Sequence, residues 1–407
     1  MLQTYQETID WLFQQFPSYQ NIGAKAYKPS LENIEKLLAS FGNPHNDLTF
    51  VHIAGTNGKG STSSMLASIL TESNQKVGLF TSPHIRDYTE RIRINGEVIA
   101  HDFVINISNE IRDKQFDFEP SFFEITFLLA ILYFKKQKCT ICVIETGLGG
   151  RLDATNIITP ILSLITNISI EHTQFLGTTI EQIAGEKAGI IKPNVPIIIS
   201  ERQAVAEDVF TTIAQKNGSN IIFASDEMIE IPEDFPLLGS YQTSNFNLVY
   251  HAIIELRKRF VINENCIHRG LINLAENTGF YGRMQVVSKN PLTIFDVSHN
   301  VAGIHLTLAS ILELNKGKLH IVYGTSADKD FTAIMADFPK NACYYFTEFS
   351  NERSAKIEQL KESASSLLLE SSYYTSPILA FEDAKKNAQE NDTLLVFGSF
   401  FLISDFY

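Results

Sequence analysis

The chain has 407 residues, enough for two or three domains, and its 44% hydrophobic and 19% charged residues are typical of a globular protein. Its 46 acidic residues outnumber the 33 basic ones, and the resulting net charge of −13 argues against bulk binding of nucleic acid or of an anionic membrane surface. No apolar stretch approaches the length of about 18 residues that a membrane-spanning helix requires.

The N-terminal segment, residues 1–16, places its apolar residues at helical spacing. Because this segment has neither a basic start nor a continuous apolar core, the sequence predicts no signal peptide. The four cysteines are too few for a disulfide framework in a chain of this length. Together these features favour a cytoplasmic protein.

From about residue 48 to residue 225, apolar segments rich in β-forming residues alternate with helical patterns. Several of these segments are nearly continuous in apolar character, which is typical of strands buried on both faces of a parallel sheet. One hairpin interrupts the alternation at residues 90–100 and turns at Asn95-Gly96. The sequence therefore predicts a doubly wound α/β domain. Its expected strands lie in residues 48–55, 75–82, 139–147, 161–169, 195–200 and 220–225.

Helices are expected between these strands. One covers residues 61–73, and another covers residues 121–137 and opens with Ser121 and Glu124 at the spacing of a capping box. Thr178 and Glu181 have the same spacing ahead of a helix expected over residues 179–192. A further helix is expected over residues 237–260, where it closes the first domain.

A second α/β pattern begins near Pro291. Its expected strands cover residues 292–300, 318–324, 342–349 and 392–399, with helices between them. The sequence thus predicts a first domain over residues 1–284, a linker over residues 285–292 and a smaller C-terminal domain over residues 293–407.

The segment G-T-N-G-K-G-S, residues 55–61, follows the first strand of the expected sheet. It differs from the common phosphate loop, because Gly55 stands four residues before Lys59 and Gly60 takes the usual Ser/Thr position. A lysine at a helix N-terminus opposes the helix dipole, and a bound phosphate would remove that conflict. A plain strand-to-helix turn is the alternative, but the lysine favours phosphate binding.

Polar residues also follow three other expected strands, namely Ser82, Glu145 and His172. The carboxyl ends of parallel strands share one edge of a sheet, and ligands bind at that edge in open α/β folds. Glu145 could hold Mg²⁺ near phosphates, since this ion prefers oxygen ligands. Taken singly, Glu145 could be a solvated strand end and His172 a packed or surface histidine, but their shared position favours a site.

Four further residues are candidates for the same site. Lys187 lies within the helix expected over residues 179–192, where a solvated lysine is the default interpretation. Asp296 and His299 follow a strand of the second domain, and Arg283 precedes that strand. An enzyme that closes two domains over its substrates would bring such residues to one edge.

Nine motifs occur in the order GTNGKGS, TSPH, ERIRING, FFEIT, ETGLGGRLDATN, EHTQFLGTTIEQIAGEKAGIIK, YQTSNFN, YGRMQ and DVSHN. This order resembles the folylpolyglutamate synthase and dihydrofolate synthase family, which belongs to the Mur ligase superfamily. The likeness extends over essentially the whole chain, and its two longest motifs are its most specific ones. It implies an α/β fold in which a P-loop-type, doubly wound ATPase domain precedes a smaller Rossmann-like ligase domain.

The resemblance implies an ATP site, because the phosphate loop of this superfamily is similar to G-T-N-G-K-G-[ST]. The residues that would cradle the ATP phosphates are Gly58, Lys59, Gly60 and Ser61. Three further positions match residues that contact ATP in the family, namely Asn245, Arg283 and Asp296.

The resemblance also implies a metal site and a substrate site. Ser82, Glu145 and His172 match Mg²⁺ ligands, and Lys187 matches a lysine that looks to be carbamylated in this family and could help to hold a second Mg²⁺. The segments that line the site for the pterin-bearing substrate match Phe123, Glu124, Leu152, Asp153 and Ala154. Glu124 is then a helix cap, a substrate contact, or both.

Two segments depart from the pattern of the family. Tyr281-Gly282-Arg283 stands where the family usually has Pro-Gly-Arg, which loosens the turn but keeps the arginine. Residues 296–301 read DVSHNV in place of Asp-x-Ala-His-Asn-Pro, and the polar members of the segment persist.

The implied activity is that of an ATP-dependent carbon–nitrogen ligase. A substrate carboxylate attacks the γ-phosphate of ATP, and the amino group of L-glutamate then attacks the acyl phosphate. The acceptor would be dihydropteroate, the γ-carboxylate of a reduced folate, or both. The catalytic candidates are Lys59, Lys187 and His299, with a structural role for His299 equally open. The expected partners are small molecules, without nucleic acid or membrane, and a monomer is expected.

Two other interpretations stay open. A Mur-type ligase acting on a peptidoglycan precursor typically carries an extra N-terminal domain, for which residues 1–47 ahead of the first strand are too few. The second is a nucleotide-binding homologue that has lost ligase activity. Retention of Ser82, Glu145, His172 and Lys187 speaks against it.

Overall fold

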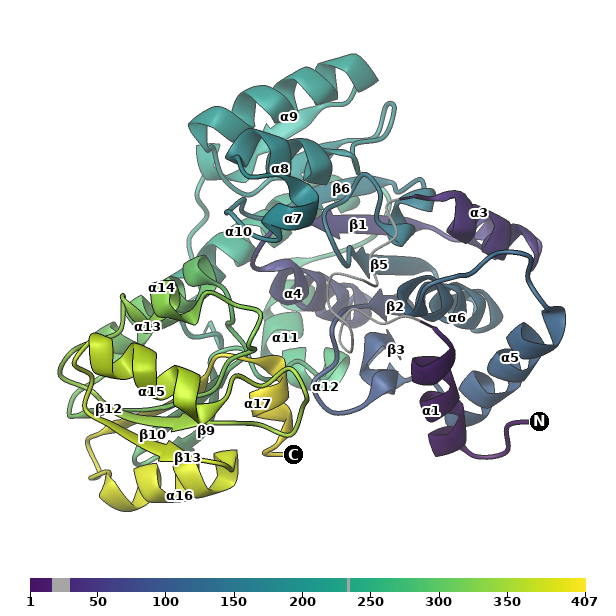
Figure 1. Cartoon of the computed structure of the whole chain (residues 1–407). Helices are drawn as coiled ribbons and strands as arrows, with labels where there is room; N and C mark the ends of the chain where they lie inside the picture. The colour runs from purple at the N-terminus through teal and green to yellow at the C-terminus, as the bar shows by residue number, and fades with distance from the viewer. Residues whose placement is uncertain (17–29, 233–234) are drawn as a thin grey trace. The chain divides into compact units, whose positions relative to one another are not determined.

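The computed structural model describes residues 1–16, 30–232 and 235–407 (Figure 1). The chain forms two compact units. The first comprises Met1–Pro236 and Thr243–Phe280, and the second comprises Leu237–Gln242 and Tyr281–Tyr407.

The first unit is built on an eight-stranded sheet within the described residues, in the order β4-β3-β2-β5-β1-β6-β7-β8. The six strands β2, β5, β1, β6, β7 and β8 are parallel to one another, whereas β3 pairs antiparallel with both β2 and β4. The strands are β1 (Phe50–Ala54), β2 (Val77–Phe80), β3 (Ile92–Ile94), β4 (Glu97–Val98), β5 (Ile141–Glu145), β6 (Leu162–Ile165), β7 (Ile197–Ile199) and β8 (Ile221–Phe223). The predicted parallel sheet and the hairpin turn at Asn95-Gly96 are confirmed.

Helices cover both faces of this sheet. Side chains of β1 and β5 such as Phe50 and Ile144 pack with α6, whereas α4 lies against β1, β2 and β5 with α11 behind it. The α-helices are α1 (Tyr5–Gln15), α3 (Glu32–Ala39), α4 (Lys59–Glu72), α5 (His101–Lys114), α6 (Phe122–Lys136), α7 (Thr173–Leu176), α8 (Ile180–Ala188), α9 (Ala204–Asn217), α10 (Ser240–Leu256), α11 (Glu264–Ile272) and α12 (Leu274–Thr278). Short 3₁₀ turns are η2 (Pro44–Asp47), η3 (Tyr88–Arg91), η4 (Ala154–Ile157) and η5 (Ala224–Asp226).

Two helix starts test the predicted capping boxes. At α6 the box is confirmed, since the Ser121 side chain accepts the Glu124 N–H and the Glu124 carboxylate accepts the Ser121 N–H. At α8 the predicted box is wrong by one residue. Thr179 is the N-cap and Gln182 completes the box, because the Gln182 side-chain oxygen accepts the N–H groups of Thr178 and Thr179.

The second unit is built on a six-stranded sheet of the order β13-β12-β11-β14-β10-β9. All neighbours are parallel except the antiparallel pair β9–β10. The strands are β9 (Gln285–Lys289), β10 (Leu292–Asp296), β11 (Leu319–Tyr323), β12 (Cys343–Thr347), β13 (Ser371–Tyr374) and β14 (Thr393–Phe397). The helices are α13 (Val301–Leu314), α14 (Phe331–Met335), α15 (Ile357–Ser366), α16 (Pro377–Asn387) and α17 (Phe400–Ser404).

Residues 285–292, where the sequence predicts a linker, instead form β9 and the turn into β10. Their pairing with β10 places them inside the second unit, which the chain enters at Tyr281. The helix expected to close the first domain does not do so, because α11 and α12 follow α10 in the first unit. The first turn of α10 itself belongs to the second unit.

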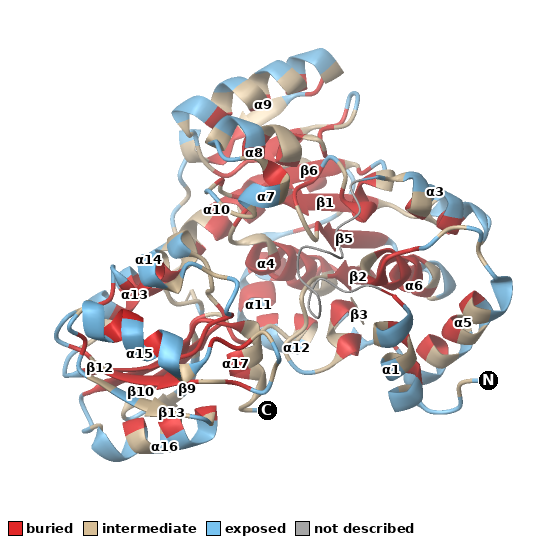
Figure 2. Ribbon diagram, in the orientation of Figure 1, coloured by how far each residue is buried: buried red, intermediate tan, exposed pale blue. Residues whose placement is uncertain are grey.

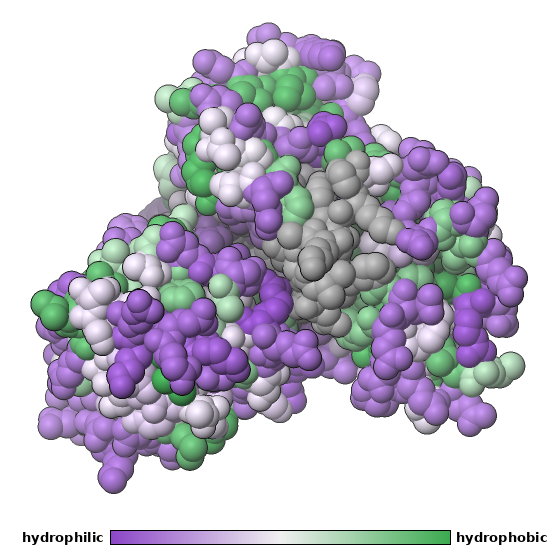
Figure 3. Space-filling model, in the orientation of Figure 1, coloured by the Kyte–Doolittle hydropathy of each residue, from purple (hydrophilic) through white to green (hydrophobic). Residues whose placement is uncertain are grey.

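Burial follows this layering. Figure 2 shows buried residues concentrated in the strands and on the inner sides of the helices that cover them. On the face drawn in Figure 3, both units are mostly hydrophilic, and hydrophobic residues gather only in small patches. Among the described residues, no helix combines the length and apolar character needed to cross a membrane.

The close crossing of α4 and α11 depends on Gly270. A Cβ added there would lie 2.6 Å from the Ile69 Cα atom, closer than such atoms approach in proteins. We predict that Gly270→Ala lowers the free energy of unfolding by about 1–3 kcal/mol, because one of the two helices must shift. Urea unfolding followed by circular dichroism measures this change.

Gly185 in α8 provides the matched control, since a Cβ there meets no atom within 4 Å. Gly185→Ala should raise the free energy of unfolding by about 0.4–1 kcal/mol, because alanine loses less backbone entropy in a helix. Equal effects of the two substitutions would show that the helix crossing does not depend on Gly270.

Candidate active site

The glycine turn joins the end of β1 to the start of α4. Gly58 is the N-cap of α4 and has a φ of 88°, a left-handed conformation that favours glycine. A Cβ at Gly58 would also collide with the side-chain oxygen of Asn245. Two residues predicted to contact ATP, Gly58 and Asn245, are therefore in direct contact.

The first turn of α4 is suited to an anion. No side chain caps this 14-residue helix, and its first turn carries no acidic residue. Its leading backbone N–H groups and the positive end of the helix dipole point out of the glycine turn. Gly60 and Ser61, predicted to bind phosphate, lie in this first turn and are buried. The geometry is that of a phosphate-binding loop.

Lys59 is held against the loop itself. Its ammonium donates hydrogen bonds to the backbone oxygens of Gly55 at 2.9 Å and Thr56 at 3.0 Å. The cation thus lies beside the N-terminus of α4, where it would meet the phosphates of a bound nucleotide.

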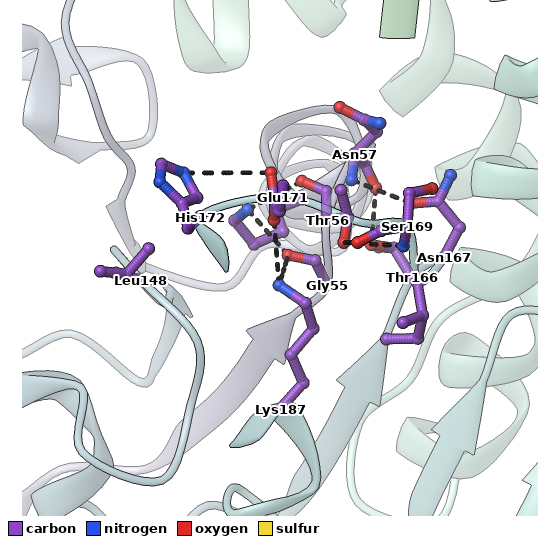
Figure 4. A network of polar contacts seen from close by, with 12 residues as sticks. Gly55, Thr56, Asn57, Leu148, Thr166, Asn167, Ser169, Glu171, His172 and Lys187 are labelled. Carbon is purple, nitrogen blue, oxygen red and sulfur yellow. Dashed lines mark hydrogen bonds and ion pairs between the residues drawn. The ribbon is translucent and has the colours of Figure 1, made fainter. Parts of the chain in front are cut away.

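The segment that follows β6 braces the loop from the side (Figure 4). The backbone N–H of Thr56 donates to the Asn167 carbonyl at 2.8 Å, and that of Asn57 donates to the Asn167 side-chain oxygen at 2.9 Å. The Thr166 hydroxyl donates to the Asn57 carbonyl at 2.6 Å. Because β6 is the parallel neighbour of β1, the loop conformation is tied to the sheet.

Lys187 reaches the same loop from α8 (Figure 4). Its ammonium donates to the Gly55 carbonyl at 2.8 Å and to Glu171 Oε1 at 3.1 Å, and its side chain is only 1% exposed. His172 directly follows Glu171 in the sequence, and its Nε2 lies 4.0 Å from Glu171 Oε2. The sequence-based default of a solvated helix lysine is therefore wrong, since Lys187 points into the site.

The charges of this group shift one another's pKa values. Burial lowers the pKa of Lys187 to about 8, with Lys59 adding to the shift and Glu171 opposing it. Burial disfavours the ionised form of Glu171, but Lys187, Lys59 and His172 outweigh it and lower the pKa of this carboxyl to about 2. At neutral pH the pair is therefore an ammonium beside a carboxylate.

Glu171 is a site residue that the sequence analysis missed. It directly precedes His172, and the Ile170 side chain before it is half exposed. The segment therefore has no regular apolar pattern that would single out Glu171. The available signal was an acidic residue next to His172 in the segment that follows a parallel strand.

Ser82 and Glu145 form the second part of the site. Glu145 ends β5, is 2% exposed, and accepts the Ser82 N–H at Oε2 over 3.1 Å. The turn that follows Ser82 is held by Glu90, whose carboxylate accepts the N–H groups of Ile85, Arg86 and Asp87. Glu145 pairs in register with Ile53, two residues before Gly55, so this carboxylate belongs to the edge that carries the loop.

Of the predicted metal ligands, Ser82 follows β2, Glu145 ends β5, His172 is the N-cap of α7 beyond β6, and Lys187 lies in α8. Among the described residues, no group of three or more His, Cys, Asp or Glu side chains is assembled as a metal cluster. Ser82 and Glu145 nevertheless offer the oxygen donors that Mg²⁺ prefers, and His172 offers a ring nitrogen; this ion takes few protein ligands and keeps several waters. The structure brings Ser82 to Glu145, and Lys187 to Glu171 beside His172.

The segments predicted to line the substrate site meet around Phe123. A Cβ at Gly147 would lie 2.6 Å from the Phe123 ring, so the glycine allows the loop after β5 to lie on that ring. Leu152 belongs to the same loop and Ala154 begins η4 directly after it, whereas Glu124 follows Phe123 but is engaged in the α6 cap.

Asp153 holds that loop together. Its Oδ2 accepts the Leu148 N–H at 2.8 Å, and its Oδ1 accepts the backbone N–H and the hydroxyl of Thr155. Burial raises the pKa of this carboxyl, although these hydrogen bonds oppose the rise. Both oxygens are thus used within the loop, which gives Asp153 a structural role at the predicted position.

The three predicted residues of the second unit also form a group. Asp296 ends β10 and accepts the N–H groups of Met284 at 2.8 Å and Ser298 at 2.9 Å. Arg283 lies over the Phe400 ring at 5.8 Å, and His299 packs edge-on against the same ring. His299 Nδ1 hydrogen-bonds the Val297 carbonyl at 3.0 Å.

Two family matches agree with the two units. Residues 53–252 match the Mur ligase middle domain, and residues 282–400 match the Mur ligase glutamate ligase domain. The chain is 31% identical to the Escherichia coli dihydrofolate synthase/folylpolyglutamate synthase, covering 95% of this chain and 92% of that protein. The chain belongs to the folylpolyglutamate synthase/dihydrofolate synthase family. A Haloferax volcanii relative, a probable bifunctional folylpolyglutamate synthase/dihydropteroate synthase, is 30% identical, and this chain spans half of its length.

Solved structures of the family share the fold. The E. coli FolC in complex with DHPP and ADP is 28% identical, with a TM-score of 0.86 over 99% of this chain and 96% of that chain. A bifunctional folylpolyglutamate synthase/dihydrofolate synthase with Mn, AMPPNP and L-glutamate bound is 25% identical, with a TM-score of 0.82 over 99% and 97%.

The buried Lys187–Glu171 pair leads to a stability prediction. In protein whose Lys187 is unmodified, Glu171→Gln would leave a buried ammonium without its carboxylate, so we predict that the free energy of unfolding of this form falls by about 3 kcal/mol at pH 7. Adding Lys187→Met should recover more than half of this loss, because both charges are then gone. Chemical denaturation measures both values.

Glu181→Gln, an exposed position in the same helix α8, is the control and should change the free energy of unfolding by less than about 0.5 kcal/mol. A Glu171→Gln effect no larger than that of Glu181→Gln would contradict the ion pair.

Proposed function

We propose that this protein is an ATP-dependent ligase that adds L-glutamate to dihydropteroate, to the γ-carboxylate of reduced folates, or to both. The observation that carries the proposal is the phosphate loop, in which Lys59 and the buried Lys187 converge on the Gly55 carbonyl. Family relatives named for these activities, and the solved complexes with DHPP, nucleotide and L-glutamate, support the choice of substrates.

The residues of the first unit suit phosphoryl transfer. The N–H groups at the start of α4 and the Lys59 ammonium would neutralise the charge that develops as a substrate carboxylate attacks the γ-phosphate. The amino group of L-glutamate then attacks the acyl phosphate, forms the amide and releases phosphate. Ser82, Glu145 and His172 would hold Mg²⁺, which supplies further charge neutralisation at the phosphates when bound.

We assign Asn245, Arg283 and Asp296 to ATP contacts, and Phe123 with the loop at residues 152–154 to the pterin-bearing substrate. Asn245 has direct support, because it touches Gly58. Phe123 offers a ring to a flat heterocycle, whereas the hydrogen bonds of Glu124 and Asp153 favour shaping of the site over direct contact.

We further propose that Lys187 is carbamylated in the active enzyme. A neutral amine adds to CO₂ and releases one proton, which leaves an anionic carbamate with oxygen ligands. Burial supports this reaction, because a pKa of about 8 leaves a usable fraction of neutral amine at neutral pH. We also propose a cytoplasmic monomer. His299 remains a candidate base for the incoming amine or a structural residue of its loop.

The first experiment measures ADP release with ATP, Mg²⁺ and L-glutamate, with dihydropteroate or tetrahydrofolate as the acceptor. Turnover with both acceptors is expected from a bifunctional enzyme, and turnover with one would narrow the activity to that acceptor. Lys59→Ala should abolish glutamate-dependent release, because the phosphates lose their cation.

Release with neither acceptor would favour the inactive nucleotide-binding homologue. Release that needs a peptidoglycan precursor instead would favour a different Mur-type ligase. Full activity of Lys59→Ala would contradict the phosphate-loop assignment.

Carbamylation of Lys187 gives a separate prediction. Lys187→Ala should lose at least about 100-fold in kcat, and short carboxylic acids should restore part of the activity by replacing the carbamate oxygens. Lys216→Ala removes an exposed lysine of α9 and should behave as the wild type with and without added acid. A Lys187→Ala enzyme with normal activity would return this lysine to a purely structural role.

A further inference from the structure

The turn that carries Arg283 in the second unit has an uncommon backbone. Gly282 has a φ of 69° and Met284 a φ of 49°, and the left-handed region is unfavourable for a residue such as methionine. Hydrogen bonds hold both ends of the turn. The Val297 N–H donates to the Gly282 carbonyl at 2.8 Å, and the Met284 N–H donates to Asp296 Oδ2 at 2.8 Å.

The other side of the turn is held by Gln285 and Tyr407. The side-chain oxygen of Gln285 accepts two hydrogen bonds, from the Gly282 N–H at 2.8 Å and from the Tyr407 hydroxyl at 2.9 Å. The Tyr407 ring also packs edge-on against Tyr281, with 5.3 Å between ring centroids and an interplanar angle of 78°. Tyr407 therefore touches the turn both through a hydrogen bond and through its ring.

The segment that carries Tyr407 is itself anchored. Phe406 packs against Phe295 at 4.8 Å and Phe381 at 5.4 Å between ring centroids. Helix α17 just ahead of it begins at Phe400, the residue whose ring lies under the Arg283 guanidinium. One short stretch, residues 400–407, thus contacts both the side chain of Arg283 and the turn that carries its backbone.

We propose that Tyr407 is a positioning residue for Arg283. The Tyr407 hydroxyl and the Gly282 N–H donate to the same Gln285 oxygen, and the Tyr407 ring packs against Tyr281. These contacts hold the turn in one conformation and so orient the Arg283 guanidinium. The inference rests on the proposed role of Arg283 in ATP binding and extends it to a residue 124 positions away in the sequence. In this proposal Tyr407 acts through Arg283 and not through a contact of its own with the nucleotide.

The size of the effect follows from the bond that is lost. The Tyr407 side chain is partly exposed, and a hydrogen bond in such a place contributes modestly. Removing its hydroxyl should therefore raise the KM for ATP by about 3- to 10-fold without a comparable loss of kcat.

The test uses Tyr407→Phe in the full chain, which keeps the ring but removes the hydroxyl. We expect the rise in the KM for ATP together with faster hydrogen exchange of the Gly282 amide, because its acceptor loses its second partner. Tyr374→Phe is the matched control. Its hydroxyl donates to Asp383 in the same unit, away from the turn, and its loss should leave both quantities unchanged.

The same substitution is then made in an Arg283→Ala background. If Tyr407 acts through Arg283, Tyr407→Phe should add no further rise in the KM for ATP. An additional rise of the same size would overturn the inference, as would an unchanged Gly282 exchange rate in the single variant. An unchanged KM in Arg283→Ala alone would instead overturn the ATP role of Arg283 on which the inference depends.

Discussion

The first unit is organised around the carbonyl oxygen of Gly55, which accepts a hydrogen bond from each of two lysines. Lys59 comes from the start of α4 and Lys187 from the end of α8, and their ammonium groups lie 2.9 and 2.8 Å from that oxygen. Two like charges at one backbone atom are costly unless a counter-charge is close. Glu171 provides it at 3.1 Å from the Lys187 ammonium, and Lys59 is the first residue of α4, whose start no side chain caps.

The acidic residues of this protein serve two different purposes. The carboxylates of Glu124, Asp153 and Asp296 accept hydrogen bonds from backbone N–H groups of nearby loops or helix ends. They therefore stabilise the conformation of those segments. Glu145 ends β5, the neighbour of the strand that leads into the phosphate loop, and Glu171 lies between β6 and α7, where it pairs with the Lys187 ammonium. The distinction separates residues that shape the site from those that carry its charge.

Much of this arrangement could be predicted from the sequence, because buried parallel strands are continuous in apolar character and their polar end residues share one edge. Other features could not. Strands β9 and β13 are partly exposed, so they lack the continuous apolar signature of a buried strand. The start of α8 carries two adjacent threonines, and only the hydrogen bonds of Gln182 decide which one caps it. The orientation of Lys187 depends on a partner 132 residues away, which no local pattern reveals.

The sequence separation of 132 residues between Gly55 and Lys187 also affects how the site forms during folding. A loop closure of this length is slow and entropically expensive, so contacts of high sequence separation form late. The glycine turn and α4 are local and can form early, but the turn receives its second ammonium only after β6 and α8 have joined the sheet. Conversely, local opening of α8 would remove Lys187 from the loop while β1 and α4 remain folded. Nucleotide affinity should thus report on the integrity of α8, and not only on that of the loop that touches the phosphates.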